Sequence, residues 1–215
     1  AGVAHEIYNP LSSIQIALQT LLNLETPSRF GPQTVEYIGI VETELEKCIS
    51  VAKRLLDLSQ VPSGGEQLVS LSSLVPEVAS LLGYEAQQRN IVLTSDLGAA
   101  PLRVLATDAE LRMVVLNLMQ NAFHAMPNGG SLAVTGRVSG ARVHLEFSDT
   151  GVGIEPGRLE QIFDPFHSRR ADGVSGTGLG LTISLAIVKR YHGDITVESD
   201  VGKGSIFTVV LPNAD

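Results

Sequence analysis

Four short segments of this 215-residue sequence contain side chains of types that can bind metal ions, nucleotides or phosphate, and the first begins at His5. Glu6 follows directly, and Asn9 lies one helical turn later. A zinc-protease helix would need a second histidine where Asn9 stands, so that two rings share one metal ion. The segment therefore excludes that zinc site. Two interpretations of His5 remain: a solvated surface histidine, or a ring that projects from a helix bundle into solvent.

The second segment carries Asn117 and Asn121, which lie four residues apart and hence on one face of a helix. Two amide oxygens on a stiff surface suit Mg²⁺, a hard cation that prefers oxygen ligands and keeps some of its waters. A pair of solvated amides is the simpler interpretation of the two residues alone, although Asn is a poor choice for a plain helix interior.

The third segment begins at Asp149, directly after an expected strand, and continues through Gly151 and Gly153. An ionised carboxylate only accepts hydrogen bonds, so at a strand end it can bind an amino group such as that of adenine. The two glycines would let a ligand approach the backbone closely. The alternative is a tight turn capped by an aspartate, which is common.

The fourth segment, Gly176-Thr177-Gly178-Leu179-Gly180, leads into an expected helix. Backbone N–H groups at a helix start attract phosphate through unpaired donors and the helix dipole. The glycine spacing fails the dinucleotide fingerprint, and Leu179 stands where a P-loop requires lysine. The segment is therefore a candidate phosphate loop of another kind, and a flexible hinge is the alternative.

The first 60 residues have the apolar spacing of a helical hairpin. In each of two runs, apolar residues recur at alternating steps of three and four, and Pro27 and Gly31-Pro32 separate the runs. Further apolar residues beside both seams, among them Ile16 and Ile49, make each stripe wider than two helices can cover. We therefore expect an antiparallel hairpin that forms a four-helix bundle in a homodimer.

The remainder of the chain mixes helices and strands. Residues 61–65 are rich in Pro and Gly, which divides the chain into a hairpin over 1–62, a linker over 63–66 and a second domain over 67–215. Helices are expected near 71–89, 108–125 and 179–191, and strands near 91–94, 131–137, 142–148, 194–198 and 205–211. Because the two types alternate only partly, the pattern predicts an α+β sandwich with helices on one face of a mixed sheet.

The composition is that of a folded chain, with 44% apolar and 18% charged residues. Its net charge of -8 offers no basic face to nucleic acid or to an anionic membrane. The single cysteine, Cys48, excludes an intrachain disulfide or a cysteine metal cage and favours a reducing, cytoplasmic location. Residues 7–24 carry no charge, but polar side chains interrupt them, so we expect neither a membrane span nor a signal peptide.

Taken together and in this order, the four segments resemble the sensor histidine kinases of two-component signalling. The segment Ile162-Phe163-Asp164-Pro165-Phe166 looks like the phenylalanine box of that family, and the resemblance extends over essentially the whole chain. It implies a dimerisation and histidine-phosphotransfer hairpin followed by the ATP-binding sandwich shared with gyrase and mismatch-repair ATPases. It also implies ATP and Mg²⁺ as cofactors and a response regulator as partner.

The resemblance assigns a role to each motif. It makes His5 the phosphoacceptor, Glu6 the adjacent carboxylate that helps take its proton, and Asn9 a residue that helps orient the water of a phosphatase reaction on the regulator. For Asn9 a purely structural place before Pro10 is equally open. The resemblance further implies a mobile lid over residues 167–175. The residues that match the nucleotide site are Asn117 and Asn121 for Mg²⁺, Asp149, Gly151 and Gly153 for adenine, and Gly176, Thr177, Gly178, Leu179 and Gly180 for the triphosphate.

Several positions depart from the family pattern. His124 occupies a place beside the phosphates where the family often has Lys or Arg, and Arg169 or Arg170 is the expected lid cation. His5 lies only four residues from the start, whereas the first helix of the family begins earlier, so we expect the core of a longer sensor. Two rival functions remain: a phosphotransfer scaffold without nucleotide binding, and a plain ATPase or serine kinase of the same nucleotide fold. Intact Asn121, Asp149 and Gly178 count against the scaffold, and a His-bearing hairpin counts against the second rival.

Overall fold

The computed structural model describes residues 65–165 and 178–214, together with Leu11, Ile14, Ile16, residues 38–41 and Leu45. The chain divides into two compact units, Ala1–Ser63 and Gly64–Asp215. All the described residues of the first unit are helical, in agreement with the helical region that the apolar spacing predicts. No helix among the described residues is long and apolar enough to cross a membrane.

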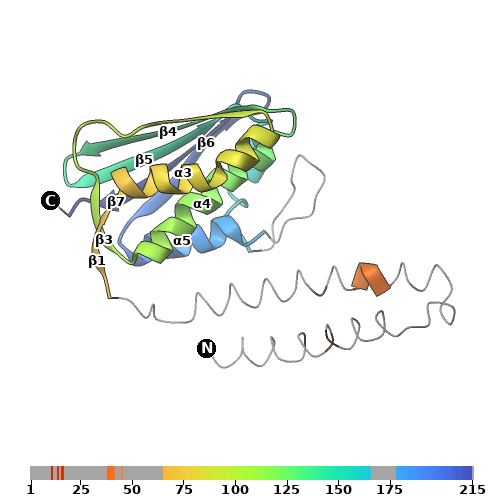
Figure 1. Ribbon diagram of the computed structural model, residues 1–215, viewed down its shortest axis with the longest axis horizontal. Coiled ribbons are helices and arrows are strands. Elements are labelled where there is room, and N and C mark those ends of the chain that lie inside the picture. Colours follow the sequence, from red (N-terminus) through yellow and green to blue (C-terminus); the bar gives the residue numbers. More distant parts are fainter. Residues whose placement is uncertain are drawn as a thin grey trace. The chain divides into compact units, whose positions relative to one another are not determined.

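The second unit contains three α-helices and seven strands among its described residues (Figure 1). The elements in chain order are β1 (Gln67–Ser70), α3 (Leu71–Gln88), β2 (Ile91–Asp96), β3 (Arg103–Ala106), α4 (Asp108–Ala125), β4 (Gly130–Ser139), β5 (Arg142–Asp149), the 3-10 helix η2 (Pro156–Arg158), α5 (Gly180–Arg190), β6 (Asp194–Asp200) and β7 (Gly204–Pro212). The three helices and five of the strands confirm the sequence predictions to within a few residues. Strands β1 and β3 were not predicted.

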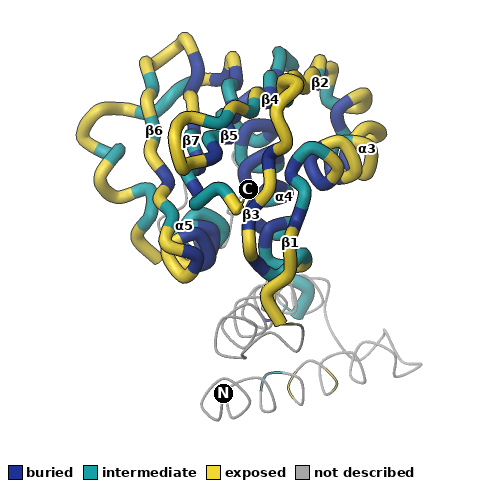
Figure 2. The backbone as a smooth tube through the Cα atoms, turned by 90° about the vertical axis from the view of Figure 1, so that its left-hand side faces the viewer, coloured by how far each residue is buried: buried dark blue, intermediate teal, exposed yellow. Residues whose placement is uncertain are grey.

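Five strands form one mixed sheet in the order β2-β4-β5-β7-β6. Strands β2 and β4 are parallel, and the other neighbours are antiparallel. The three helices α3, α4 and α5 cover one face of this sheet, as Figures 1 and 2 show. The prediction of an α+β sandwich with helices on one face of a mixed sheet is therefore confirmed. Strands β1 and β3 pair with each other in a separate two-stranded antiparallel sheet.

The core lies between the helices and the inward face of the sheet. Because side chains alternate between the two faces of a strand, every second residue of β5 and β7 points to the helices. Phe147, Phe207 and Val209 are such inward residues, and all are buried. Their neighbours Glu146 and Thr208 are only partly buried, on the opposite face. This alternation fixes the register of the strands and decides which side chains at the strand ends face the helices.

Helix α4 crosses the middle of the domain and is held at its first turns by both neighbouring helices. Arg112 forms an ion pair with Glu77 of α3 at 2.7 Å. Glu110 accepts a hydrogen bond from Tyr191 and pairs with Arg190, at the end of α5. Burial raises the pKa of the Tyr191 hydroxyl, with a further contribution from Glu110, so the hydroxyl stays a neutral donor. Helices α4 and α5 are thus joined by polar contacts at this end.

Candidate functional site

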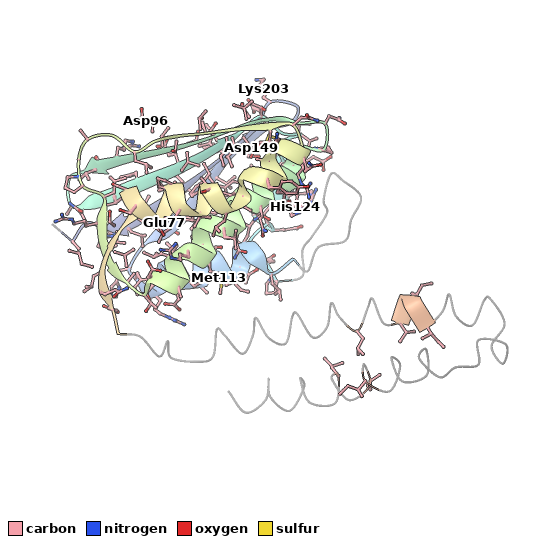
Figure 3. The ribbon with its side chains drawn as sticks, in the orientation of Figure 1. Glu77, Asp96, Met113, His124, Asp149 and Lys203 are labelled. Atoms are coloured by element: carbon pink, nitrogen blue, oxygen red, sulfur yellow. The ribbon has the colours of Figure 1, made fainter. Side chains whose placement is uncertain are left out.

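The inward face of the sheet changes from apolar to polar at one end. One row of register partners across β4, β5, β7 and β6 consists of Leu132, Asp149, Ser205 and Ser199. The next row inward is entirely apolar: Val134, Phe147, Phe207 and Val197. The sheet therefore directs a carboxylate and two hydroxyls to the side on which the helices pack. Figure 3 shows Asp149 at the same end of the second unit as His124 of α4.

Asp149 is a buried carboxylate held by two backbone donors. Only 5% of the residue is exposed. Its Oδ1 accepts hydrogen bonds from the backbone N–H of Gly151 at 2.8 Å and of Ser205 at 3.2 Å. Burial raises the pKa of the carboxyl, and the two backbone hydrogen bonds oppose that rise. Both described bonds reach Oδ1, so among the described residues Oδ2 is the oxygen left to accept from a ligand.

The raised pKa gives the nucleotide-free chain a testable pH dependence. Between the ordinary pKa of 3.8 and the raised value, the folded chain binds a proton that the unfolded chain does not, so the free energy of unfolding falls as pH rises through this window.

An amide at position 149 in place of the carboxyl would carry no charge to bury. We therefore expect Asp149→Asn to raise the melting temperature of the free chain at neutral pH, and to lose that advantage at acid pH. Thermal unfolding across a pH series measures both effects, with Asp164→Asn at an exposed position as control. A difference in melting temperature that does not change with pH would contradict the prediction.

The glycines after Asp149 are required by the chain's own backbone. A Cβ on Gly151 would lie 2.5 Å from the carbonyl oxygen of Ala125, at the end of α4. Gly153 has a φ of +71°, and a Cβ there would overlap the carbonyl oxygen of Asp200. The turn is thus wedged between the end of α4 and the β6–β7 hairpin, and Val152 N–H donates to Ala125 O at 2.9 Å. The sequence analysis explained these glycines by the close approach of a ligand to the backbone. In the structure, α4 and the β6–β7 hairpin are the groups that approach the backbone of the turn.

The two asparagines lie on α4 and are both partly buried. The Nδ2 of Asn117 donates to the carbonyl oxygen of Gly180 and to Ser184 Oγ, each at 3.4 Å. These bonds leave its Oδ1 as an acceptor. The Nδ2 of Asn121 is buried and has no hydrogen-bond partner among the described residues. An unpaired buried amide is costly in a folded chain, and such a group is commonly explained by a ligand, ion or water that completes it.

The fourth motif opens helix α5. Gly178 has a φ of +66°, a conformation that glycine adopts at little cost. Leu179 is buried and precedes the helix, which begins at Gly180. The first backbone N–H groups of an α-helix have no partner within the helix, so they remain available to an anion. Because Asn117 contacts Gly180, the structure brings the second and fourth motifs together.

Not every predicted site residue can be placed. His124 is partly buried in the last turn of α4, three residues after Asn121. Ser199 and Ser205 are site residues that the motifs do not include; the signal that could have found them is their alternation with the apolar inward residues of β6 and β7. The predicted residues that lie outside the described part of the chain are His5, Glu6, Asn9, Arg170, Gly176 and Thr177, with the lid over 167–175.

Comparison with protein families gives two matches that together span most of the chain. Residues 1–64 match the family described as His Kinase A (phospho-acceptor) domain. Residues 106–215 match the family described as Histidine kinase-, DNA gyrase B-, and HSP90-like ATPase.

Similar proteins and structures agree with these matches. The sensor histidine kinase ZraS of Salmonella typhimurium is 37% identical over 213 residues, which are 99% of this chain and 44% of that protein. Sporulation kinase C of Bacillus subtilis is 32% identical over 99% of this chain and 48% of its own length. The chain spans about half the length of the curated relatives it matches.

Two solved structures of histidine kinase ThkA are also similar. Its catalytic domain has a TM-score of 0.63 and 28% identity, covering 70% of this chain and 99% of that one. A structure of ThkA in complex with the response regulator protein TrrA has a TM-score of 0.70 and 27% identity, covering 100% of this chain and 60% of that one.

Proposed function

This chain belongs to the sensor histidine kinases, and on that premise we propose that it binds ATP in the domain over residues 67–215 and transfers the γ-phosphoryl group to His5 in the hairpin over 1–62. From His5 the phosphoryl group passes to an aspartate of a response regulator. The observation that carries this proposal is the buried Asp149 carboxylate, whose Oδ2 is left as an acceptor, at the same end of the domain as the last turn of α4. A phosphotransfer scaffold that binds no nucleotide would not require this buried carboxylate.

We assign the adenine end of the site to Asp149, whose Oδ2 accepts from the 6-amino group. Gly151 and Gly153 shape the turn that holds this carboxylate. At the triphosphate end, the backbone of Gly178, Leu179 and Gly180 offers N–H donors at the start of α5. His124, Thr177 and Arg170 supply further donors or positive charge to the phosphates in this proposal.

The two asparagines fit a magnesium ion. Asn117 uses its Nδ2 on Gly180 and Ser184, so its Oδ1 is available as a hard oxygen ligand. Asn121 would likewise bind the cation through Oδ1, and its buried Nδ2, which has no partner among the described residues, would donate to a phosphate oxygen. When bound, the cation neutralises charge on the β- and γ-phosphates. These two side chains would hold it from one face of α4, and because their amides are neutral, the charge of the cation would remain available to the phosphates.

The chemical step is phosphoryl transfer, which depends on positioning and on charge neutralisation. His5 attacks as a neutral imidazole, a nucleophile at cytoplasmic pH. Glu6 fixes the tautomer by bonding one ring nitrogen and takes the proton that the imidazole loses. A nitrogen–phosphorus bond forms, the bond from phosphorus to the bridging oxygen breaks, and ADP leaves with the electron pair. Asn9, four residues after His5 in the sequence, orients water for dephosphorylation of the regulator.

Removal of the Asn121 side chain separates metal-dependent from metal-independent binding. We expect Asn121→Ala to weaken ATP binding in Mg²⁺ on the order of tenfold, because a ligand to the cation is lost. In EDTA the affinity should stay within about twofold of the original. Because the variant also removes an unpaired buried Nδ2, its nucleotide-free melting temperature should not fall. Calorimetric titration with and without Mg²⁺, and thermal unfolding, measure these quantities.

The matched control for this variant is Gln120→Ala, an amide one position away on α4 and therefore turned about 100° around the helix. It should not change the magnesium dependence. An equal loss of ATP affinity in Mg²⁺ and in EDTA would remove Asn121 from the cation site.

We propose that the chain is a homodimer through residues 1–62. Ile14 and Val41 are about half exposed within one chain, at 48% and 49%, and Ile16 is 65% exposed, as expected of apolar helix faces that a second hairpin covers. Light scattering should give about twice the 22.8 kDa of one chain. Ile14→Glu with Val41→Glu should give a monomer. The control variant Leu81→Glu, at an exposed apolar position of α3, should remain a dimer. A monomer of the unchanged chain at micromolar concentration would refute the dimer.

The function as a whole is tested by following labelled phosphate from ATP. Incubation with γ-labelled ATP and Mg²⁺ should label the chain through an acid-labile bond to nitrogen, and a receiver domain added afterwards should take up the label. Release of labelled phosphate without any label on the protein would favour a plain ATPase, and an acid-stable label would favour a serine kinase. Absence of nucleotide binding would favour the phosphotransfer scaffold.

A further inference from the structure

Ser199, near the end of β6, makes three hydrogen bonds, one to the turn that follows Asp149 and two to the start of β7. Its Oγ accepts from the backbone N–H of Ile154 at 2.8 Å. It donates to the carbonyl oxygen of Gly204 at 2.8 Å, and it lies 3.0 Å from Ser205 Oγ. A hydroxyl has only one proton to give. Since Ser199 gives its proton to Gly204, Ser205 must be the donor of the serine pair.

These bonds close a ring of contacts around Asp149. The turn that begins at Asp149 ends at Ile154, which is bonded to Ser199. Ser199 is bonded to Ser205, and the Ser205 N–H returns to Asp149 Oδ1. The carboxylate is therefore fixed from both sides, by the N–H of Gly151 in its own turn and by the β6–β7 hairpin. The Ser199 hydroxyl links the turn to that hairpin.

We propose that Ser199 is a positioning residue that sets the preference of this site for adenine, by holding the turn and the hairpin in the one arrangement that places Asp149 Oδ2 against the 6-amino group. The inference rests on the proposed function, in which Asp149 binds adenine. Without the hydroxyl, Ile154 N–H loses its acceptor and the turn shifts to find another. The carboxylate then moves, although every group that could contact the nucleotide is still present.

The chemistry at purine position 6 separates this role from a general loss of structure. ATP carries an amino donor there, whereas inosine triphosphate carries a carbonyl acceptor and gains nothing from a carboxylate. Displacing Asp149 therefore weakens ATP binding and leaves inosine triphosphate binding almost unchanged. A merely structural defect weakens both equally.

The test compares equilibrium binding of ATP and inosine triphosphate to the full chain. Ser199→Ala should reduce the ratio of the two affinities about tenfold, the order expected when one buried donor loses its partner. Ser199→Thr, which keeps the hydroxyl, should restore the ratio. The matched control is Thr196→Ala, an exposed hydroxyl on the opposite face of β6, which should leave the ratio unchanged. If Ser199→Ala does not fold, Ser199→Cys keeps the volume with a weak hydrogen-bonding group and should lower the ratio in the same direction.

The outcomes separate this inference from the proposed function. If the unchanged chain does not prefer ATP to inosine triphosphate, the adenine site itself is wrong. If the unchanged chain prefers ATP and Ser199→Ala keeps that preference, or lowers both affinities equally, Ser199 does not position the carboxylate. Failure of Ser199→Thr to restore the ratio would also overturn the assignment.

Discussion

Replacement of His5 by Gln should abolish the transfer of phosphate from ATP to the chain, while ATP affinity stays within about twofold of the original. Glutamine is similar in size and polarity, but its amide nitrogen is not a nucleophile, so no nitrogen–phosphorus bond can form. The proposed nucleotide site belongs to the separate unit over Gly64–Asp215, so loss of the acceptor should leave binding in place. Electrophoresis of the labelled chain measures the first quantity, and calorimetric titration measures the second.

Glu6→Gln is the companion variant. It keeps the nucleophile but removes the group proposed to take its proton, so labelling should slow without a change in ATP affinity. A label that survives acid, or one that persists in His5→Gln, would mean that another residue is the acceptor.

Asp149→Asn should weaken ATP binding about 10- to 100-fold, the range for a hydrogen bond to a charged group. The amide oxygen can still accept from the N–H groups of Gly151 and Ser205. Its NH₂ group then occupies the place of Oδ2, and two donors, this NH₂ and the 6-amino group, face each other. The variant thus converts an acceptor into a donor without changing the shape of the site.

The same substitution should not weaken inosine triphosphate binding, because a donor at position 149 suits a carbonyl group at purine position 6. Reversal of the nucleotide preference, together with the higher stability of the free variant at neutral pH, would identify Asp149 as a charge buried for binding at a cost in stability. Equal weakening of both nucleotides would show that the substitution only disturbs the fold.

The helices were predictable because their signals are local and repeated. In α4, apolar residues recur at helical spacing from Leu111 to Phe123, and Asp108 and Glu110 suit the first turn. Strands β1 and β3 have no such signal, since each is only four residues long. In the sequence, α3 and β2 separate the two strands, which pair with Gln67 opposite Ala106. A pairing between residues so far apart in the sequence produces no periodic pattern of apolar residues in either strand.

The site was predictable as motifs but not as an arrangement. The spacing of Asn117 and Asn121 places them on one helix face, and Asp149 was expected at a strand end, where the structure has it. One of the two hydrogen bonds that hold the Asp149 carboxylate comes from a residue far along the chain. Ser205 follows Asp149 by 56 residues, and only the register of β5 and β7 makes them neighbours. The reason for the glycines was likewise not predictable from the local sequence, because the carbonyl groups that exclude a side chain at Gly151 and Gly153 belong to α4 and to β6.

The polar contacts between α4 and α5 have a consequence for how the domain opens. Glu110 binds Arg190 and Tyr191 where α5 ends, and Asn117 binds Gly180 and Ser184 where α5 begins. Helix α5 is therefore attached to α4 by polar contacts at both of its ends, so opening of one helix to solvent should require opening of the other. Amide hydrogens of the two helices should exchange with deuterium as one cooperative unit. In such a unit, the cation proposed for α4 and the phosphate proposed for the start of α5 should slow the same exchange event.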